Sequence, residues 1–198
     1  KSLTIQEIAE QTTCPSKEVA SAIRALKKLG YRIESPKRGQ YAFQGAPNKL
    51  LPYEVQRRIR TDVIGQQMEY FEKITSTSAV ARDLTARQNP ATLHGMVIAA
   101  EVQTGGTGRL GRAWVSPGGG IWTTIILKPT IPIDRLFMLT MVGSIAVVRA
   151  VKKISGIGAL IKWPNDIYIG KKKVGGSSPS SQPKGPSSIT VWWGSGSM

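Results

Sequence analysis

The sequence is poor in the residues that build metal sites and disulfides, with one cysteine, Cys14, and one histidine, His94, in 198 residues. A single cysteine excludes an intrachain disulfide, and the two residues together are too few for a zinc site, so no metal site is expected. No apolar run approaches the length of about eighteen residues that a membrane span needs. The N-terminus shows no secretory signal, and a reducing cytoplasm is therefore the expected compartment.

Acidic residues are also scarce, with 12 Asp and Glu against 27 Lys and Arg, a net charge of +15. The excess is spread along the chain: residues 1–60 hold 12 basic and 5 acidic residues, and residues 61–198 hold 15 and 7. A basic surface favours polyanionic partners such as nucleic acid or nucleotides. A merely solvated basic surface would show the same composition.

The N-terminal pattern predicts two helices between residues 4 and 29. Thr4 and Glu7 have the spacing of a capping box at the start of the first helix. After a break, Ser16 is expected to cap the second helix, whose apolar residues recur at helical spacing. Gly30 is expected to end it.

Two strand-forming stretches, Tyr31–Ile33 and Gln40–Phe43, flank a turn at residues 35–39 and predict a β-hairpin. Two helices followed by a hairpin predict a winged helix-turn-helix, which we place with its connector in residues 1–60. DNA binding is the expected role, and a small helical domain for protein contacts is the alternative. The basic residues expected to contact DNA are Lys17, Arg24, Lys27, Lys28, Lys37 and Arg38.

The remainder predicts a second domain, of α+β class with a central mixed sheet, over residues 61–176. A helical, basic connector at residues 53–60 precedes it. The expected strands are residues 68–74, 96–102, 120–127, 160–163 and 167–169, and the expected helices are residues 78–87 and 137–153.

A glycine-rich loop, Gly105–Arg112, follows the expected strand at residues 96–102. It contains G-x-G-x-x-G, but a dinucleotide fingerprint must open a helix, and the following Ala113–Gly120, with its proline and three glycines, cannot start one. Glycines let backbone N–H groups approach an anion, and Arg109 and Arg112 can fork onto carboxylate or phosphate. Trp114 offers a flat face to a base. A long surface hairpin with incidental arginines is the alternative.

A second segment, Lys162–Gly176, contains Lys-Trp-Pro-Asn-Asp and then three lysines. Asn165 and Asp166 also fit simple turn formers, and Lys171–Lys173 also fit a solvated hairpin tip.

Together the two segments resemble biotin–protein ligases, in particular those that also act as biotin operon repressors. The family has a G-R-G-R-x-G-R-x-W-x-S-P-x-G-G loop, a K-W-P-N-D turn and a K-x-x-G-[IL]-L segment. The loop and the turn together are a specific signature of the family, whereas either motif alone would be only moderately specific. The matching positions are Gly106, Gly108, Arg109, Gly111, Arg112, Trp114, Ser116, Pro117, Gly119, Gly120, Lys162–Asp166, Lys173 and Gly176.

The resemblance implies a class II synthetase-like catalytic domain that activates biotin with ATP and Mg²⁺ as biotinyl-5′-AMP. It then transfers biotin to a lysine of a biotin carboxyl carrier domain. A DNA operator is a further implied partner, no membrane is involved, and the full-length form is compatible with a homodimer. The implied biotin-binding residues are Ser76, Thr77, Ser78, Gln103, Thr107, Gly108, Arg109 and Lys173; the nucleotide-binding residues are Arg109, Arg112, Trp114 and Asn165; Arg109, Arg112 and Lys173 are the implied catalytic residues.

Two positions depart from the family pattern. Thr107 replaces the first arginine of the loop, and Ser78 replaces the asparagine of a Ser-Thr-Asn motif. The first change removes one cation and the second shortens one polar contact, and either is expected to weaken retention of the adenylate.

The resemblance ends at Gly176, and residues 177–198, rich in Ser, Pro and Gly, are expected to be a disordered, non-family tail. The family continues there with Ile-Leu-Thr-Glu, a strand ending in Val-Gly-Ile-Gly-Leu-Asn, and a small β-barrel. Codons for Gly176–Ser180 can be chosen so that the frame starting at the third base encodes Ile-Leu-Thr-Glu. Codons for Trp192–Met198 likewise encode Val-Val-Gly-Ile-Gly-Leu-Asn in that frame.

We therefore hypothesise a frameshift near Gly176 and an incomplete catalytic domain. The loss of family strands is expected to leave a sheet edge and an apolar face uncovered, with low stability and little ligase activity. A DNA-binding regulator that senses a small ligand without ligating it is the alternative from another class. A lipoate-type ligase ranks below both, because the R-R-x-S-G-G-G string of that group is absent.

Overall fold

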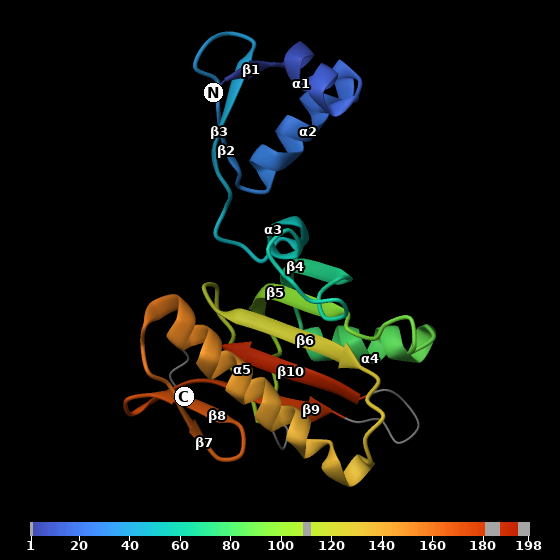
Figure 1. The fold of residues 1–198 in the computed structure, drawn as a ribbon, viewed down its shortest axis with the longest axis vertical. Helices are drawn as coiled ribbons and strands as arrows, with labels where there is room; N and C mark the ends of the chain where they lie inside the picture. The colour runs from blue at the N-terminus through green and yellow to red at the C-terminus, as the bar shows by residue number, and fades with distance from the viewer. Residues whose placement is uncertain (1, 109–111, 181–186, 194–198) are drawn as a thin grey trace. The chain divides into compact units, whose positions relative to one another are not determined.

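The computed structural model describes residues 2–108, 112–180 and 187–193. The chain divides into two compact units, Lys1–Lys49 and Leu50–Met198 (Figure 1). The connector helix α3 (Pro52–Gln56) falls in the second unit, where it packs against β4.

The first unit contains the expected pair of helices and the expected hairpin. Its elements are β1 (Leu3–Thr4), α1 (Ile5–Thr12), α2 (Ser16–Lys28), β2 (Arg32–Glu34) and β3 (Gln40–Gly45). The Thr4 hydroxyl accepts from the Glu7 N–H while the Glu7 carboxylate accepts from the Thr4 N–H, so the capping box is confirmed. Val19 and Ile23 of α2 are buried.

Two details of this unit differ from expectation. The N-cap of α2 is Pro15, and Ser16 is its first helical residue with no side-chain cap, because proline fits the extended backbone at that position. The two residues of β1 add a third strand beside β3, giving the order β1-β3-β2. So short a strand leaves no alternation for a sequence pattern to detect.

The second unit is built on a seven-stranded mixed sheet with the order β4-β5-β6-β10-β9-β8-β7. The strands are β4 (Met68–Ile74), β5 (Val97–Gln103), β6 (Ile121–Leu127), β7 (Leu160–Lys162), β8 (Asp166–Ile169), β9 (Lys172–Ser180) and β10 (Ser187–Trp193). Only β4 and β5 among neighbouring strands run parallel. The mixed α+β class is confirmed.

Helices cover both faces of this sheet (Figure 1). On one face α4 (Thr77–Arg87) packs through Ala81 onto Ile98 of β5 and Ile126 of β6. On the other face α5 (Phe137–Ser155), preceded by the short 3-10 turn η2 (Ile133–Arg135), crosses β10 and β9. Among the described residues, no helix has the length and apolar character needed to cross a bilayer.

The expectation of a disordered tail after Gly176 is wrong for the described part of that tail. β9 runs on to Ser180, and β10 pairs along its length with β6 and with β9. The backbone of residues 187–193 thereby gains hydrogen-bonded neighbours on both sides, which composition alone does not reveal. The uncovered sheet edge expected at this position is therefore absent among the described strands, since β10 lies between β6 and β9.

Candidate functional site

The site begins where the two parallel strands end. β4 stops at Ile74 and β5 stops at Gln103, and the carboxyl ends of neighbouring parallel strands meet at one edge of a sheet. The turns that follow are tied together, because the Thr104 N–H donates to the Ile74 carbonyl at 2.9 Å and the Gly105 N–H donates to the Thr75 carbonyl at 2.8 Å. The start of α4 and the glycine-rich loop are thereby brought to the same edge.

Gln103 is the centre of the hydrogen bonds at this edge. Its Oε1 accepts from the Thr77 N–H at 2.8 Å and from the Thr77 hydroxyl at 3.0 Å. Its Nε2 donates to the Ser116 hydroxyl at 3.0 Å. One amide side chain therefore connects the first turn of α4 to the far leg of the glycine-rich loop.

Further hydroxyl groups contact Thr77, the hydrogen-bond partner of Gln103. The Thr124 hydroxyl of β6 donates to the Thr77 hydroxyl at 2.9 Å and lies 3.4 Å from the Ser78 hydroxyl. Thr77 and Thr124 are fully buried, and Ser76 and Ser78 nearly so. Buried hydroxyl groups at a strand edge are well suited to hold a small polar ligand, since they can both donate and accept.

The loop beside Gln103 encloses a pocket of about 360 Å³, lined by residues 102–106 and 113–117. Its two legs are joined where the Trp114 N–H donates to the Gly106 carbonyl at 2.8 Å. A Cβ on Gly106 would lie 2.6 Å from both Ser116 Oγ and the Trp114 carbonyl oxygen, so the legs can approach only because this residue is glycine.

The outer part of the glycine-rich loop carries the predicted residues between Gly106 and Trp114. Thr107 is exposed and bridges to Ala113, while the Gly108 N–H donates to the Arg112 carbonyl at 2.8 Å. Arg112 is exposed. Arg109 lies outside the described residues.

Lys173 of β9 reaches this loop from a distant part of the sequence. Its Nζ lies 5.2 Å from the centre of the Trp114 ring, a cation–π distance. The same Nζ lies 2.7 Å from Asp166 Oδ1, and only 16% of the lysine side chain is exposed. The two sequence segments are thus brought together in space, which their spacing in the sequence could not show.

Asn165 is buried away from solvent and has a structural partner. Its side-chain Nδ2 donates to the Ser177 carbonyl at 2.6 Å, and the Ser177 N–H donates back to the Asn165 carbonyl at 3.2 Å. The Ser144 hydroxyl of α5 lies 2.9 Å from the Ser177 hydroxyl. These bonds fix the turn before Asp166 to α5 and β9, so they position the Asp166–Lys173 pair.

Three residues of this site were missing from the sequence-based set. Thr124 is a polar residue between two apolar, buried positions of the same strand face, Trp122 and Ile126, a signal that could have identified it. Ser116 was recognised only as a family position, although it receives the Gln103 amide. Asp166 was recognised only as a family position and a turn former, because its pairing with Lys173 depends on the β8–β9 register.

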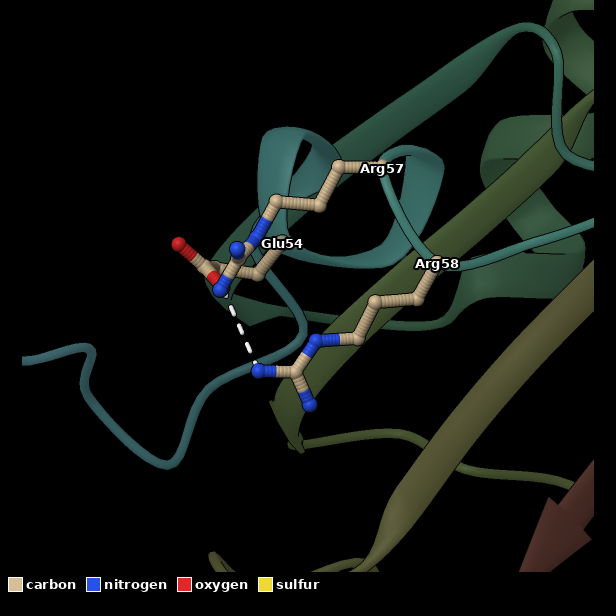
Figure 2. Close-up of polar contacts among 3 residues, drawn as sticks. All are labelled: Glu54, Arg57 and Arg58. Atoms are coloured by element: carbon tan, nitrogen blue, oxygen red, sulfur yellow. Dashed lines mark hydrogen bonds and ion pairs between the residues drawn. The ribbon is translucent and has the colours of Figure 1, made fainter.

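Two acidic residues anchor the start of the second unit. Glu54 of α3 is largely buried and accepts from Arg57 Nε at 2.9 Å and Nη2 at 2.6 Å, while Arg58 Nη2 lies 3.8 Å away (Figure 2). Glu101 of β5 accepts from the Leu50 N–H at 2.8 Å. Burial and the neighbouring Glu101 carboxylate raise the pKa of Tyr70 to about 12.

The basic residues expected to contact DNA are all exposed on the first unit. Lys17, Arg24, Lys27 and Lys28 lie on α2, and Lys37 and Arg38 lie in the β2–β3 turn. The Lys27 Nζ stands 5.7 Å from the Tyr41 ring centre, next to the hairpin. Helix and hairpin thus each present positive charge, the arrangement that phosphate contacts require.

Comparison with known proteins agrees with this geometry. A family model described as the biotin/lipoate A/B protein ligase family matches residues 70–193, which passes Gly176. A Bacillus subtilis protein named bifunctional ligase/repressor is 37% identical over 172 residues, 86% of this chain and 52% of its own length. The chain therefore spans about half the length of the curated relatives it matches.

Solved structures are similar to this chain as well. The Aquifex aeolicus biotin protein ligase in complex with biotin and ATP is 29% identical with a TM-score of 0.56, over 65% of this chain and 52% of that one. The Leishmania major biotin protein ligase in complex with biotinyl-5-AMP is 26% identical with a TM-score of 0.56, over 65% and 57%.

Proposed function

The chain belongs to the biotin/lipoate A/B protein ligase family, and on that premise we propose that its second unit activates biotin with ATP and passes it to a carrier lysine. The observation that supports this proposal most strongly is the Gln103–Thr77 hydrogen-bond cluster, which lies at the carboxyl ends of β4 and β5 beside a pocket of about 360 Å³. Relatives of this fold have been solved with biotin and ATP.

In the proposed first step a biotin carboxylate oxygen attacks the α-phosphorus of ATP. The bond to the bridging oxygen breaks, and pyrophosphate leaves with that electron pair. Two anions must approach each other, and cations at the point of approach lower the barrier. We assign this role to Lys173, whose Nζ lies against the Trp114 ring, and to Arg112 of the loop, with Arg109 assigned as a further cation from the sequence.

In the proposed second step an uncharged carrier lysine amine attacks the biotin carbonyl carbon of biotinyl-5′-AMP. The carbon–oxygen bond to AMP breaks, AMP leaves as the anion, and the amine loses one proton to solvent. Gln103 and the hydroxyl groups of Ser76, Thr77 and Ser78 supply the donors and acceptors that hold biotin. The described parts of the loop, residues 105–108 and 112–116, are proposed to shield the anhydride from water.

Mg²⁺ enters this proposal only as the companion of the ATP phosphates. Within the described part of the chain, no group of three His, Cys, Asp or Glu side chains is placed to hold a metal ion. Magnesium commonly uses one or two carboxylates together with substrate phosphates. The one carboxylate at the site, Asp166, pairs with Lys173, and no step is assigned to the ion.

The first unit is proposed to be a winged helix that binds a DNA operator. Its helix pair, hairpin and exposed basic residues support this, as does the Bacillus subtilis relative whose name includes a repressor. A homodimer on DNA belongs to the same proposal.

Biotin-dependent exchange of [³²P]pyrophosphate into ATP tests the ligase proposal. We expect exchange when the reading frame after Gly176 is repaired, and little from the 198-residue chain, whose catalytic domain we propose to be incomplete. If the repaired protein shows no exchange but still binds DNA, the ligase proposal is wrong, and a regulator that senses a small ligand is the better assignment.

A further inference from the structure

The hairpin of β7 and β8 continues the sheet face on which Lys173 lies. Leu160 of β7 pairs with Tyr168 of β8, and Tyr168 pairs in turn with Lys173 of β9. Side chains of directly paired residues share one face of a sheet. These three residues therefore form a row that leads from the Lys173–Trp114 contact to the edge strand β7. Two strand spacings, about 10 Å in all, separate the ends of the row.

Exposure rises along this row toward the edge of the sheet. The Lys173 side chain is 16% exposed, Tyr168 is half-buried, and Leu160 is 70% exposed. Trp163, in the turn that follows β7, is 74% exposed. Large apolar side chains that are exposed together are typical of a surface that binds another protein.

The other face of the hairpin is already occupied within the chain. Ile167 is fully buried, and Ile169 lines an apolar groove together with Val147 and Val151 of α5. Successive residues of a strand point to opposite faces, so the face that carries Tyr168 points away from α5. That face is the one open to a partner.

Positive charge surrounds the row. Lys162 is exposed, with its Nζ 5.8 Å from the centre of the Tyr168 ring, and Lys171–Lys172 are exposed where β8 turns into β9. Asp166 is the single acidic residue between positions 160 and 173, and it pairs with Lys173. Such a surface attracts an acidic partner and repels a second copy of this chain, whose net charge is +15.

We propose that the hairpin surface, made up of Leu160, Lys162, Trp163 and Tyr168, docks the carrier domain during biotin transfer. The carrier meets it with an apolar side chain surrounded by acidic residues. This proposal rests on the proposed ligase function, in which a protein must bring its lysine amine to the anhydride beside Lys173. A specific interface covers roughly 800 Å² of each partner, so a domain that reaches Lys173 also covers a row about 10 Å long beside it. Nucleic acid would pair with the lysines but would leave Leu160 and Trp163 without apolar partners.

Steady-state transfer of biotin to the unbiotinylated carrier domain of an acetyl-CoA carboxylase tests the proposal. Leu160→Asp in the repaired protein should raise the KM for the carrier domain at least about tenfold, because a carboxylate then faces the acidic residues of the carrier. Lys162→Glu should act in the same direction, and added salt should reduce its effect.

Val142→Asp is the matched control. Val142 is 61% exposed on α5, which covers the opposite face of the sheet, and this variant should keep the original KM for the carrier domain. Pyrophosphate exchange should stay within about twofold of the original in both aspartate variants, since neither residue belongs to the Gln103 site.

An equal carrier KM in the Leu160→Asp and Val142→Asp variants would overturn the proposal. So would a parallel loss of pyrophosphate exchange in Leu160→Asp, which would assign the residue to adenylate formation. A loss of DNA binding in Leu160→Asp with an unchanged carrier KM would also overturn it and assign the surface to nucleic acid. If the original repaired protein shows no exchange, the ligase proposal itself fails, and the docking proposal fails with it.

Discussion

Lys173 Nζ lies 2.7 Å from Asp166 Oδ1 across the β8–β9 hairpin. The pair forms because the hairpin register sets Asp166 opposite Gly176 and places Lys173 opposite Tyr168, with an irregularity between Ile167 and Tyr168. The carboxylate holds the ammonium group against the Trp114 ring, at the pocket beside Gln103. An incoming anion would find the cation already in position.

Replacing this cation should impair adenylate formation. Lys173→Met keeps the unbranched apolar stem and removes the ammonium group, so we expect pyrophosphate exchange by the repaired protein to fall by a factor of about 10²–10³. Lys171→Met, at the exposed turn of the same hairpin, is the matched control and should keep nearly full exchange. Equal losses in the two variants would show that the hairpin contributes only general positive charge.

The Glu54 carboxylate should depend strongly on Arg57. Arg57→Ala removes two hydrogen bonds of 2.9 and 2.6 Å from a carboxylate whose side chain is 10% exposed, so the free energy of unfolding should fall by about 1–3 kcal/mol. Arg58→Ala removes only a 3.8 Å contact, and the Arg58 side chain is 71% exposed. This change should therefore alter the free energy of unfolding by less than about 0.5 kcal/mol. Urea unfolding of both variants measures the difference, and a larger effect of Arg58→Ala would contradict the geometry.

Tyr70 should make the second unit lose stability in alkali. Its pKa rises from 10.0 to about 12 in the folded chain, because of burial and then the Glu101 charge. The unfolded chain therefore ionises this phenol first, and the stabilisation present below pH 10 is lost as the pH rises toward 12. The stability of the original chain relative to Tyr70→Phe should decline across that range in urea titrations. A constant difference would rule out the raised pKa.

The coding DNA around Gly176 tests the frameshift hypothesis. We expect the frame that starts at the third codon position to encode Ile-Leu-Thr-Glu after Gly176 and Val-Val-Gly-Ile-Gly-Leu-Asn near the end of the chain. Nucleotide sequencing decides it directly. A frame without either string would leave residues 177–198 as the protein's own sequence and remove the reason to expect low activity.

The helices and most strands could be predicted from the sequence, because their signals are local. The capping box at Thr4 and the apolar period of residues 137–153 each define an element within a few turns, and α5 extends only two residues beyond the expected end. The last strand could not be predicted in this way. β10 is held by backbone pairing with the preceding strand β9 and with β6, which lies far away in the sequence.

The site was predictable only in part, for a similar reason. Gln103 and Thr77 were identified through the family resemblance, but their hydrogen bonds depend on β4 and β5 running parallel. Thr124 enters through β6, and no spacing along the chain links it to Thr77. Residue types could suggest a ligand site, whereas the partners within it follow from the sheet order.

Biotin binding measured by isothermal titration calorimetry tests the central claim most directly. The repaired protein should bind biotin at one site, and Gln103→Ala should weaken binding by at least about tenfold, because Thr77 and Ser116 lose the amide that orients them. Gln88→Ala, at the exposed end of α4, should bind like the original protein. Absence of biotin binding by the folded repaired protein, or equal affinity in the Gln103→Ala and Gln88→Ala variants, would contradict the assignment of this pocket.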